Sequence, residues 1–142
     1  MSADGKAAAR AVFEVWSTGE LDRLDHLVAP DVVHHDPYDP HAADGLEGMK
    51  RTIELNRAAF PDMRLVVEDQ VAEGDKVVTR WRGEMTHLGE LGGAPPSGKQ
   101  VTISGITIDR FEDGKIVEAW RSMDTLGLLT GIGVLGPRRA AS

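Results

Sequence analysis

The sequence predicts an α+β fold, a half-open cone in which helices come first and a curved antiparallel sheet folds over them. Two observations support this prediction. Apolar residues recur at helical spacing in the first part of the chain, up to Phe60, and the apolar period changes to two from Met63 onward. At 142 residues the chain fits one domain, assigned to residues 1–135, and residues 136–142 are expected to be a disordered tail.

Composition and charge narrow the classes of partner. The chain is 41% hydrophobic with no apolar run near the roughly 18 residues of a membrane span, which predicts a soluble protein without a membrane partner. The net charge of −7 argues against nucleic-acid binding. The chain has no cysteine and its N-terminus does not resemble a signal peptide, so a cytoplasmic location is expected. Small molecules are the expected partners.

Three helices are predicted in the first half. The first has Ala9, Val12, Phe13 and Trp16 on one stripe and ends at Gly19, where a left-handed C-cap fits. The second is short, carries Leu21, Leu24 and Val28, and ends before Pro30. The third follows a capping box formed by Asp44 and Glu47, and runs through Met49, Ile53, Asn56 and Phe60 until Pro61.

Strands are predicted at residues 63–72, 76–87, 100–111 and 115–123, with a brief additional strand at the start of the segment from Asp31. In the second long strand one alternating set of side chains should face inward: Val77, Thr79, Trp81, Met85 and His87. The connection from Leu88 to Lys99 is rich in Gly and Pro and long for a hairpin, so it is a candidate for the mouth of a pocket.

The last hairpin allows two registers. A two-residue turn at Asp113-Gly114 pairs Phe111 with Ile116 and places Glu118 and Trp120 on the face of Asp109. A three-residue loop pairs Phe111 with Lys115 instead, and that face then carries Val117, Ala119, Arg121 and Met123. We favour the second register, because it also allows a diagonal ion pair between Arg110 and Glu118 on the outer face.

The proline-interrupted segment HHDPYDPH, residues 34–41, concentrates histidine and aspartate. His35 is a candidate general acid or base, with a backbone-bonded loop histidine as the alternative. His34 and His41 fit the structural interpretation better. His34, His35, Asp36, Asp39 and His41 together suggest a metal cluster, but their spacing matches no standard motif, so no metal is predicted.

His87 and Asp109 are further candidates for proton transfer. His87 should point toward a pocket rim, unless it is a satisfied histidine at the edge of the core. Asp109 shares its face with mostly apolar residues, so burial would raise its pKa toward values useful in acid/base chemistry, unless it reaches solvent near the strand end. Trp16, Phe60 and Trp81 are candidate walls of an apolar pocket, and Tyr38 is a candidate hydrogen-bonding residue within it.

Several segments together resemble the SnoaL-like polyketide cyclases and ester cyclase-like proteins of the nuclear-transport-factor-like superfamily. These segments are STGELDRLDHLVAPDVVHHDP, GLEG, FPD, GDKVVTRW, THLGELGGAPPSGK, FEDGKIVEAW and DTLGLL, and they cover nearly the whole chain. The resemblance implies a cone-shaped α+β barrel that encloses an apolar pocket, usually in a homodimer. It also implies aldol ring closure by an aspartate acting as general acid/base, without metal or organic cofactor.

In the better-known cyclases that aspartate directly follows the tryptophan of the last strand, at the position matched here to Arg121. A histidine on the preceding strand matches Thr107, whereas the histidine of THLGE is retained as His87. The resemblance therefore implies altered chemistry: His35, His87 and Asp109 would transfer protons, and Arg121 would polarise a carbonyl or hold an enolate. Asp124 is a weaker catalytic candidate that could also cap a turn, and Thr107 and Met123 are assigned to substrate binding.

Three functions follow as hypotheses. The first is an enzyme that cyclises, isomerises or hydrates a hydrophobic oxygenated molecule. The second is a dimeric binding module that kept the cone and lost the chemistry, favoured by the replacements at Thr107 and Arg121. The third is an epoxide hydrolase similar to the limonene-epoxide type, in which Asp109, Arg121 and a third carboxylate would form an Asp-Arg-Asp arrangement.

Overall fold

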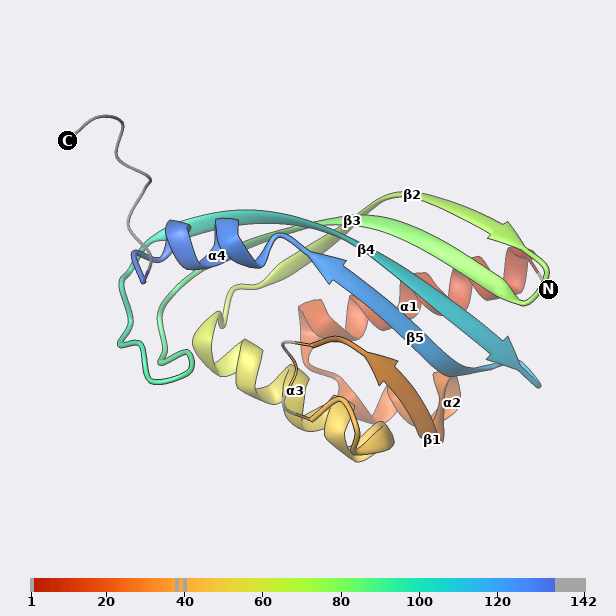
Figure 1. Cartoon of the computed structure of the whole chain (residues 1–142). Coiled ribbons are helices and arrows are strands. Elements are labelled where there is room, and N and C mark those ends of the chain that lie inside the picture. Colours follow the sequence, from red (N-terminus) through yellow and green to blue (C-terminus); the bar gives the residue numbers. More distant parts are fainter. Residues whose placement is uncertain (1, 38, 40, 135–142) are drawn as a thin grey trace.

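A computed structural model describes residues 2–37, 39 and 41–134 of the chain. A single five-stranded sheet arches over the helices α1 and α3, as Figure 1 shows. We call the face toward these helices the inner face of the sheet and the opposite face the outer face. The predicted α+β class is confirmed, although the sheet stays open, with β1 and β2 as its two edges. The predicted tail at residues 136–142 lies outside the described residues.

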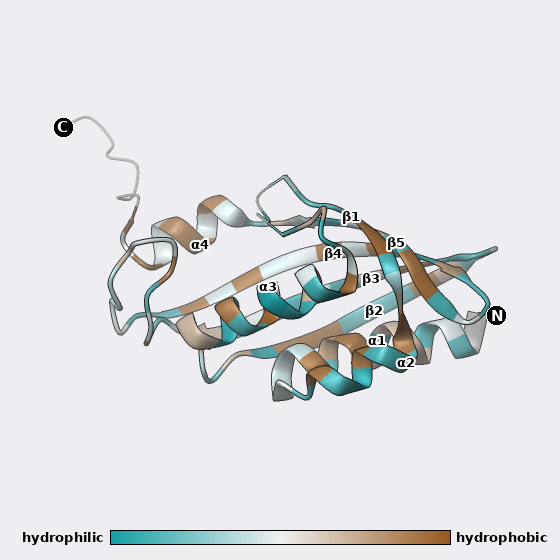
Figure 2. Cartoon of the chain, turned by 90° about the horizontal axis from the view of Figure 1, so that it is seen from below, coloured by the Kyte–Doolittle hydropathy of each residue, from teal (hydrophilic) through white to brown (hydrophobic). Residues whose placement is uncertain are grey.

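The predicted helices are confirmed. Helix α1 spans Ser2–Thr18 and is followed by Gly19 at a φ of 81°, the left-handed conformation that favours glycine. A 3₁₀ turn at Leu21–Arg23 and the short α2 at Leu24–Leu27 form the second helical segment, but Val28 already belongs to the next strand. Helix α3 spans Gly45–Ala59. Hydrophobic and hydrophilic residues alternate along α1 and α3 in Figure 2, as expected for helices with one buried face.

The predicted capping box at the start of α3 is wrong. Asp44 occupies the N-cap position, but its side chain makes no capping hydrogen bond. Its carboxylate lies 3.4 Å from Nδ1 of His41 instead. Asp39 ties the preceding loop to the helix, because its Oδ1 accepts hydrogen bonds from the His41 backbone and from the Thr52 hydroxyl, both at 2.8 Å. No described helix is long and apolar enough to span a membrane.

The strands are β1 Val28–His35, β2 Arg64–Glu73, β3 Lys76–Thr86, β4 Gln100–Glu112 and β5 Lys115–Met123, in the spatial order β1-β5-β4-β3-β2. The last four match the predicted ranges within one or two residues and pair antiparallel. The prediction of a purely antiparallel sheet is wrong, because β1 pairs parallel with β5. The long crossover through α3 and three strands lets β1 run in the same direction as β5.

The core lies between the inner face and the helices. The inward set predicted for β3 is confirmed, since Val77, Thr79, Trp81, Met85 and His87 are all buried. From α1, Val12, Phe13 and Trp16 pack toward the sheet, and the rings of Phe13 and Trp81 lie 6.0 Å apart between centroids. A fourth helix, α4 at Thr125–Gly131, is not among the predicted elements. It follows β5 and packs against β4.

The last hairpin combines both predicted registers. Asp113 and Gly114 have positive φ angles of 51° and 79°, and Phe111 pairs with Ile116 across this two-residue turn. The register then shifts by one residue, so that Arg110 pairs with Glu118 and Thr107 with Arg121. The predicted three-residue loop is therefore wrong, but the predicted face of Arg121 is right, because a bulge near Val117 restores it.

Candidate active site

Four neighbouring strands, β1, β5, β4 and β3, place polar side chains in two adjacent rows on the inner face. In the first row, His34 of β1, Ala119 of β5 and Asp109 of β4 are neighbours across the sheet. In the second row, Arg121 of β5 pairs with Thr107 of β4, which pairs with Thr79 of β3. Since side chains of paired residues point to the same face, both rows face the helices. The bulge of the last hairpin is what brings Arg121 to this face.

Asp109 is a buried carboxyl group on an apolar surface. Its exposed fraction is 5%, and its strand partners on the inner face are Val77 and Ala119. No described residue forms a hydrogen bond or an ion pair with its side chain. Burial raises the pKa of Asp109 from 3.8 to about 7, because the charged carboxylate loses its hydration without gaining a compensating partner. Of the two alternatives that the sequence leaves open for Asp109, burial and solvent exposure near the strand end, the structure shows burial.

Arg121 is held by an ion pair and by an aromatic ring. Its Nε donates to Oδ2 of Asp36 at 2.8 Å, and Nη2 lies 2.6 Å from the same oxygen. Its guanidinium carbon lies 5.2 Å from the ring centroid of Trp16, in a cation–π contact. The Arg121 side chain remains 23% exposed. The site therefore grades from a solvent-accessible edge at Arg121 to a buried interior at Asp109.

His34 is the second titratable side chain of the first row. Burial lowers its pKa, and the nearby positive charge of Arg121 lowers it further, whereas Asp39 and Asp36 oppose these effects. No hydrogen bond joins its imidazole to any described residue. His34 is therefore a neutral imidazole at neutral pH with its polar atoms available to a ligand.

Aromatic side chains surround these rows. Trp81 is buried, and its Nε1 donates a hydrogen bond of 3.0 Å to Oγ1 of Thr107. This bond fixes the hydroxyl beside Arg121. Met123 follows two residues after Arg121 on the same face and is partly buried. Trp16, Trp81, Thr107 and Met123 thus lie on or against the inner face near Arg121, and their role in substrate binding stays a prediction. Tyr38 lies outside the described residues.

His87 is buried at the far end of the inner face. Its Nδ1 accepts the backbone N–H of Ser97 at 3.1 Å and lies 2.9 Å from the Ser97 hydroxyl, so the imidazole anchors the loop after β3. Its Nε2 is buried without a hydrogen-bond partner among the described residues, and its ring lies 5.5 Å from that of Phe60. Since Asp109 pairs with Val77, ten residues separate it from His87 along the strand direction, roughly 33 Å. The structure does not bring His87 and Phe60 to Asp109.

His35 and Asp124 also lie apart from Asp109. His35 is exposed on the outer face, where Nε2 lies 2.7 Å from a Glu118 carboxylate oxygen and the ring stacks on Trp120 at 5.2 Å. Glu118 also accepts a hydrogen bond from Arg110 at 3.0 Å, so the predicted outer-face ion pair is present as a direct pair rather than a diagonal one. The Oδ1 of Asp124 accepts the Gly127 N–H at 2.8 Å and caps α4, which is the capping role the sequence suggests.

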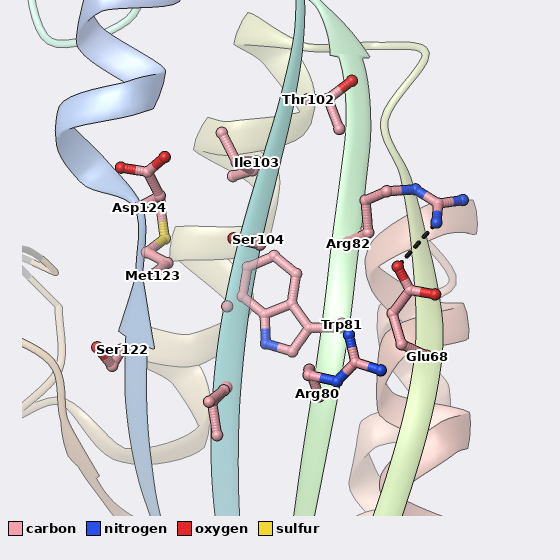
Figure 3. A pocket seen from close by; sticks show the side chains of 12 residues that line it. Glu68, Arg80, Trp81, Arg82, Thr102, Ile103, Ser104, Ser122, Met123 and Asp124 are labelled. Atoms are coloured by element: carbon pink, nitrogen blue, oxygen red, sulfur yellow. Dashed lines mark hydrogen bonds and ion pairs between the residues drawn. The ribbon is translucent and has the colours of Figure 1, made fainter.

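A groove of about 520 Å³ crosses the outer face of β3, β4 and β5, and Figure 3 shows the side chains along it. Its two arginines pair with acidic residues of β2: Arg82 with Glu68 at 2.8 Å, and Arg80 with Asp69 at 3.0 Å. Neither Asp109 nor Arg121 lines it. We place the candidate site on the inner face, because burial is the main cause of the pKa shifts of Asp109 and His34 there, whereas the pKa shifts on the outer face come mainly from exposed ion pairs.

The sequence pattern predicts no catalytic role for His34 or Asp36. In that pattern His34 fits a structural role better, and Asp36 belongs only to a possible metal cluster, whereas among the described residues no group of three or more His, Asp or Glu side chains converges as a metal site would require. Strand parity was the available signal. In a strand that continues to His35, two adjacent histidines face opposite sides of the sheet, so one of them must face the helices.

Comparisons with known proteins agree with this architecture. A family model for SnoaL-like polyketide cyclases matches residues 6–132. The structure is similar to that of TsrD from Streptomyces laurentii, with 30% identity, a TM-score of 0.86, and coverage of 95% of this chain and 98% of that one. It is also similar to AclR, a candidate hydroxylase from Streptomyces galilaeus, with 30% identity, a TM-score of 0.83, and coverage of 98% and 87%.

A third similar structure is IdmH, a candidate polyketide cyclase from Streptomyces antibioticus, with 32% identity, a TM-score of 0.79, and coverage of 91% of this chain and 98% of that one. A comparison with curated proteins finds no match.

Proposed function

Because the chain belongs to the SnoaL-like polyketide cyclase family, we propose that it catalyses a cofactor-independent acid/base reaction on a hydrophobic, oxygenated small molecule. The observation that carries the proposal is the Asp109 carboxyl group, which is buried, lacks a hydrogen-bond partner among the described residues, and has a pKa of about 7. A group that titrates near the working pH can both accept and return a proton. A carboxyl group with only a structural role would be hydrogen-bonded at this depth.

The proposed reaction begins at a carbon next to a substrate carbonyl. The Asp109 carboxylate removes a proton from that carbon, and negative charge develops on the carbonyl oxygen. Arg121 lies diagonally across from Asp109 in the sheet. The backbone positions of such diagonal neighbours are roughly 7–8 Å apart, so a carbonyl group can lie between the two side chains. The Arg121 guanidinium stabilises the developing enolate. The enolate then closes a ring on a second carbonyl or is protonated at another carbon, and Asp109 returns its proton.

A hydrogen-exchange assay tests this chemistry without knowledge of the natural substrate. The ketone 2-tetralone has an acidic methylene group between its ring and its carbonyl, and proton NMR in D₂O follows the loss of that signal. We expect the protein to accelerate the exchange above the buffer rate. Arg121→Ala should lower the acceleration roughly 100-fold, as loss of an oxyanion-stabilising donor does.

The control for Arg121→Ala addresses its ion pair with Asp36. Removal of the guanidinium alone leaves a carboxylate with an exposed fraction of only 9% beside the lost charge, which destabilises the fold. The double variant Asp36→Asn/Arg121→Met removes both charges. It should unfold at a temperature closer to that of the wild type and still lack the exchange activity. Wild-type exchange rates in a folded Arg121 variant would remove this residue from the mechanism.

A second candidate is an epoxide hydrolase of the limonene-epoxide type. It is favoured by the ion pair of Arg121 with Asp36, and Asp109 lies diagonally across from the same arginine in the sheet. Incubation with limonene oxide distinguishes the two reactions, because only the hydrolase adds water and forms a diol. A protein that produces neither exchange nor diol fits the binding module. We also propose that the chain forms a homodimer, as its family resemblance implies, which light scattering would measure.

A further inference from the structure

We propose that His34 is a second catalytic group of this site, which donates a hydrogen bond to the substrate oxygen that becomes negative when Asp109 removes a proton from carbon. The inference rests on the proposed acid/base function and adds to it the group that would contact the enolate oxygen. The residue is His34, whereas the sequence pattern favours its neighbour His35 as the general acid or base.

The pairing of the strands places His34 and Asp109 on opposite sides of a small residue. Ala119 pairs with both of them, so the three residues form one row across β1, β5 and β4. Two strand spacings separate the outer members of the row by about 10 Å between Cα atoms. Ala119 carries the smallest side chain of the row, so the longer side chains of His34 and Asp109 extend past it toward the helices. A substrate group there would contact a carboxyl group on one side and an imidazole on the other.

The His34 imidazole has no competing partner within the described part of the chain. No hydrogen bond joins it to a described residue, in contrast to His35, whose Nε2 lies 2.7 Å from Glu118, and to His87, which holds Ser97. A partly buried imidazole without a partner loses hydration and gains nothing in return. A ligand oxygen would satisfy it.

The charges around His34 keep it neutral. Arg121 is the nearby positive charge and, with burial, lowers the pKa of His34, while Asp36, Asp39 and the neighbouring His35 have smaller effects. Asp36 is itself paired with Arg121. A neutral imidazole still carries one N–H donor, and it can stabilise an enolate without first gaining a proton from solvent.

The same balance indicates the class of substrate. Arg121 is compensated by Asp36, His34 is neutral, and Asp109 is protonated in part near neutral pH. The site therefore holds little net charge and fits a neutral ketone or diketone better than a carboxylate. In the reaction the C–H bond breaks, its proton moves to Asp109, and its electron pair forms the enolate whose oxygen accepts from His34. Asp109 later returns the proton to the product.

Two measurements test His34. The first is hydrogen exchange of 2-tetralone, and the second is the binding of 2-naphthol, a planar analogue of its enol, followed by fluorescence. His34→Leu should lower the exchange rate roughly 100-fold, in the range for a lost oxyanion donor. It should also weaken the binding of 2-naphthol about tenfold, as loss of one hydrogen bond does. His34→Gln keeps an N–H donor and should restore most of both. His26→Leu, which removes an exposed imidazole, is the matched control.

The outcomes separate the two proposals. If His34→Leu matches the wild type in both measurements, the role of His34 is overturned and the proposed function stands. If the wild type catalyses no exchange but binds 2-naphthol through His34, the proposed function is overturned and His34 remains the donor to an enol-like oxygen. Loss of exchange in His35→Leu with wild-type exchange in His34→Leu would overturn the assignment from strand parity.

Discussion

Replacement of Asp109 by asparagine is expected to abolish the proposed exchange chemistry, with a loss of about 100-fold to 10,000-fold in rate. The amide preserves the size of the side chain but cannot accept a proton from carbon. In the wild type the rate should rise with pH through about 7, because burial raises the pKa of Asp109 to that value and the carboxylate is the active base. Proton NMR of 2-tetralone in D₂O at several pH values measures both effects.

The control for this substitution is Asp75→Asn, which removes an exposed carboxylate from the turn before β3. It should leave both the rate and its pH profile unchanged. Circular dichroism of each variant checks that the fold is intact. An Asp109→Asn protein that exchanges 2-tetralone at the wild-type rate would mean that another group is the base.

The second large effect is on stability. The pKa of Asp109 is raised from 3.8 to about 7 in the folded state, so between these values the folded chain binds more protons than the unfolded chain. The stabilisation from protonated Asp109 is complete below about pH 4 and is lost as pH rises through 7. A difference of about 3 pKa units corresponds to about 4 kcal/mol. Above pH 8 the free energy of unfolding of Asp109→Asn should therefore exceed that of the wild type by up to this amount.

Urea unfolding of both proteins from pH 5 to pH 8 measures this difference. Other groups titrate as well: the lowered pKa of His34 makes stability rise with pH below about 6.5, the opposite direction. Because both proteins retain His34, the difference between their curves isolates Asp109. Parallel curves over this range would contradict the raised pKa.

Local patterns in the sequence were enough to predict most elements of the fold. The helical stripe ending at Gly19 and the period-two strands from Met63 depend on residues close in the chain, and the structure confirms them. Helix α4 was missed because it is short and rich in glycine, although Asp124 before it and the spacing of Leu128 and Ile132 were usable signals. The capping box did not form, because the Asp44 carboxylate lies beside the His41 imidazole of the preceding loop instead of capping α3. Asp39 holds the same loop against the helix through the Thr52 hydroxyl.

The site was predicted less completely, and the hairpin of β4 and β5 shows why. The two-residue turn at Asp113-Gly114 is present, and the inner-face position of Arg121 that the Arg110–Glu118 ion pair favoured is right as well. Each argument implied a register that excluded the other. A bulge of one residue satisfies both, and no local signal near Val117 marks it, because the shift depends on how the two strands pack on the helices.

The sequence by itself determined the fold class, the mostly apolar strand face that carries Asp109 and the absence of thiol chemistry, since these follow from periodicity and composition. Only the tertiary structure decided which polar residues meet. Asp36 and Arg121 lie 85 residues apart in the chain and form an ion pair. His34 and Asp109 lie in one row of the sheet because each pairs with Ala119 of β5. Such pairs depend on the parallel docking of β1 on β5, which is a long-range contact whose register no local pattern specifies.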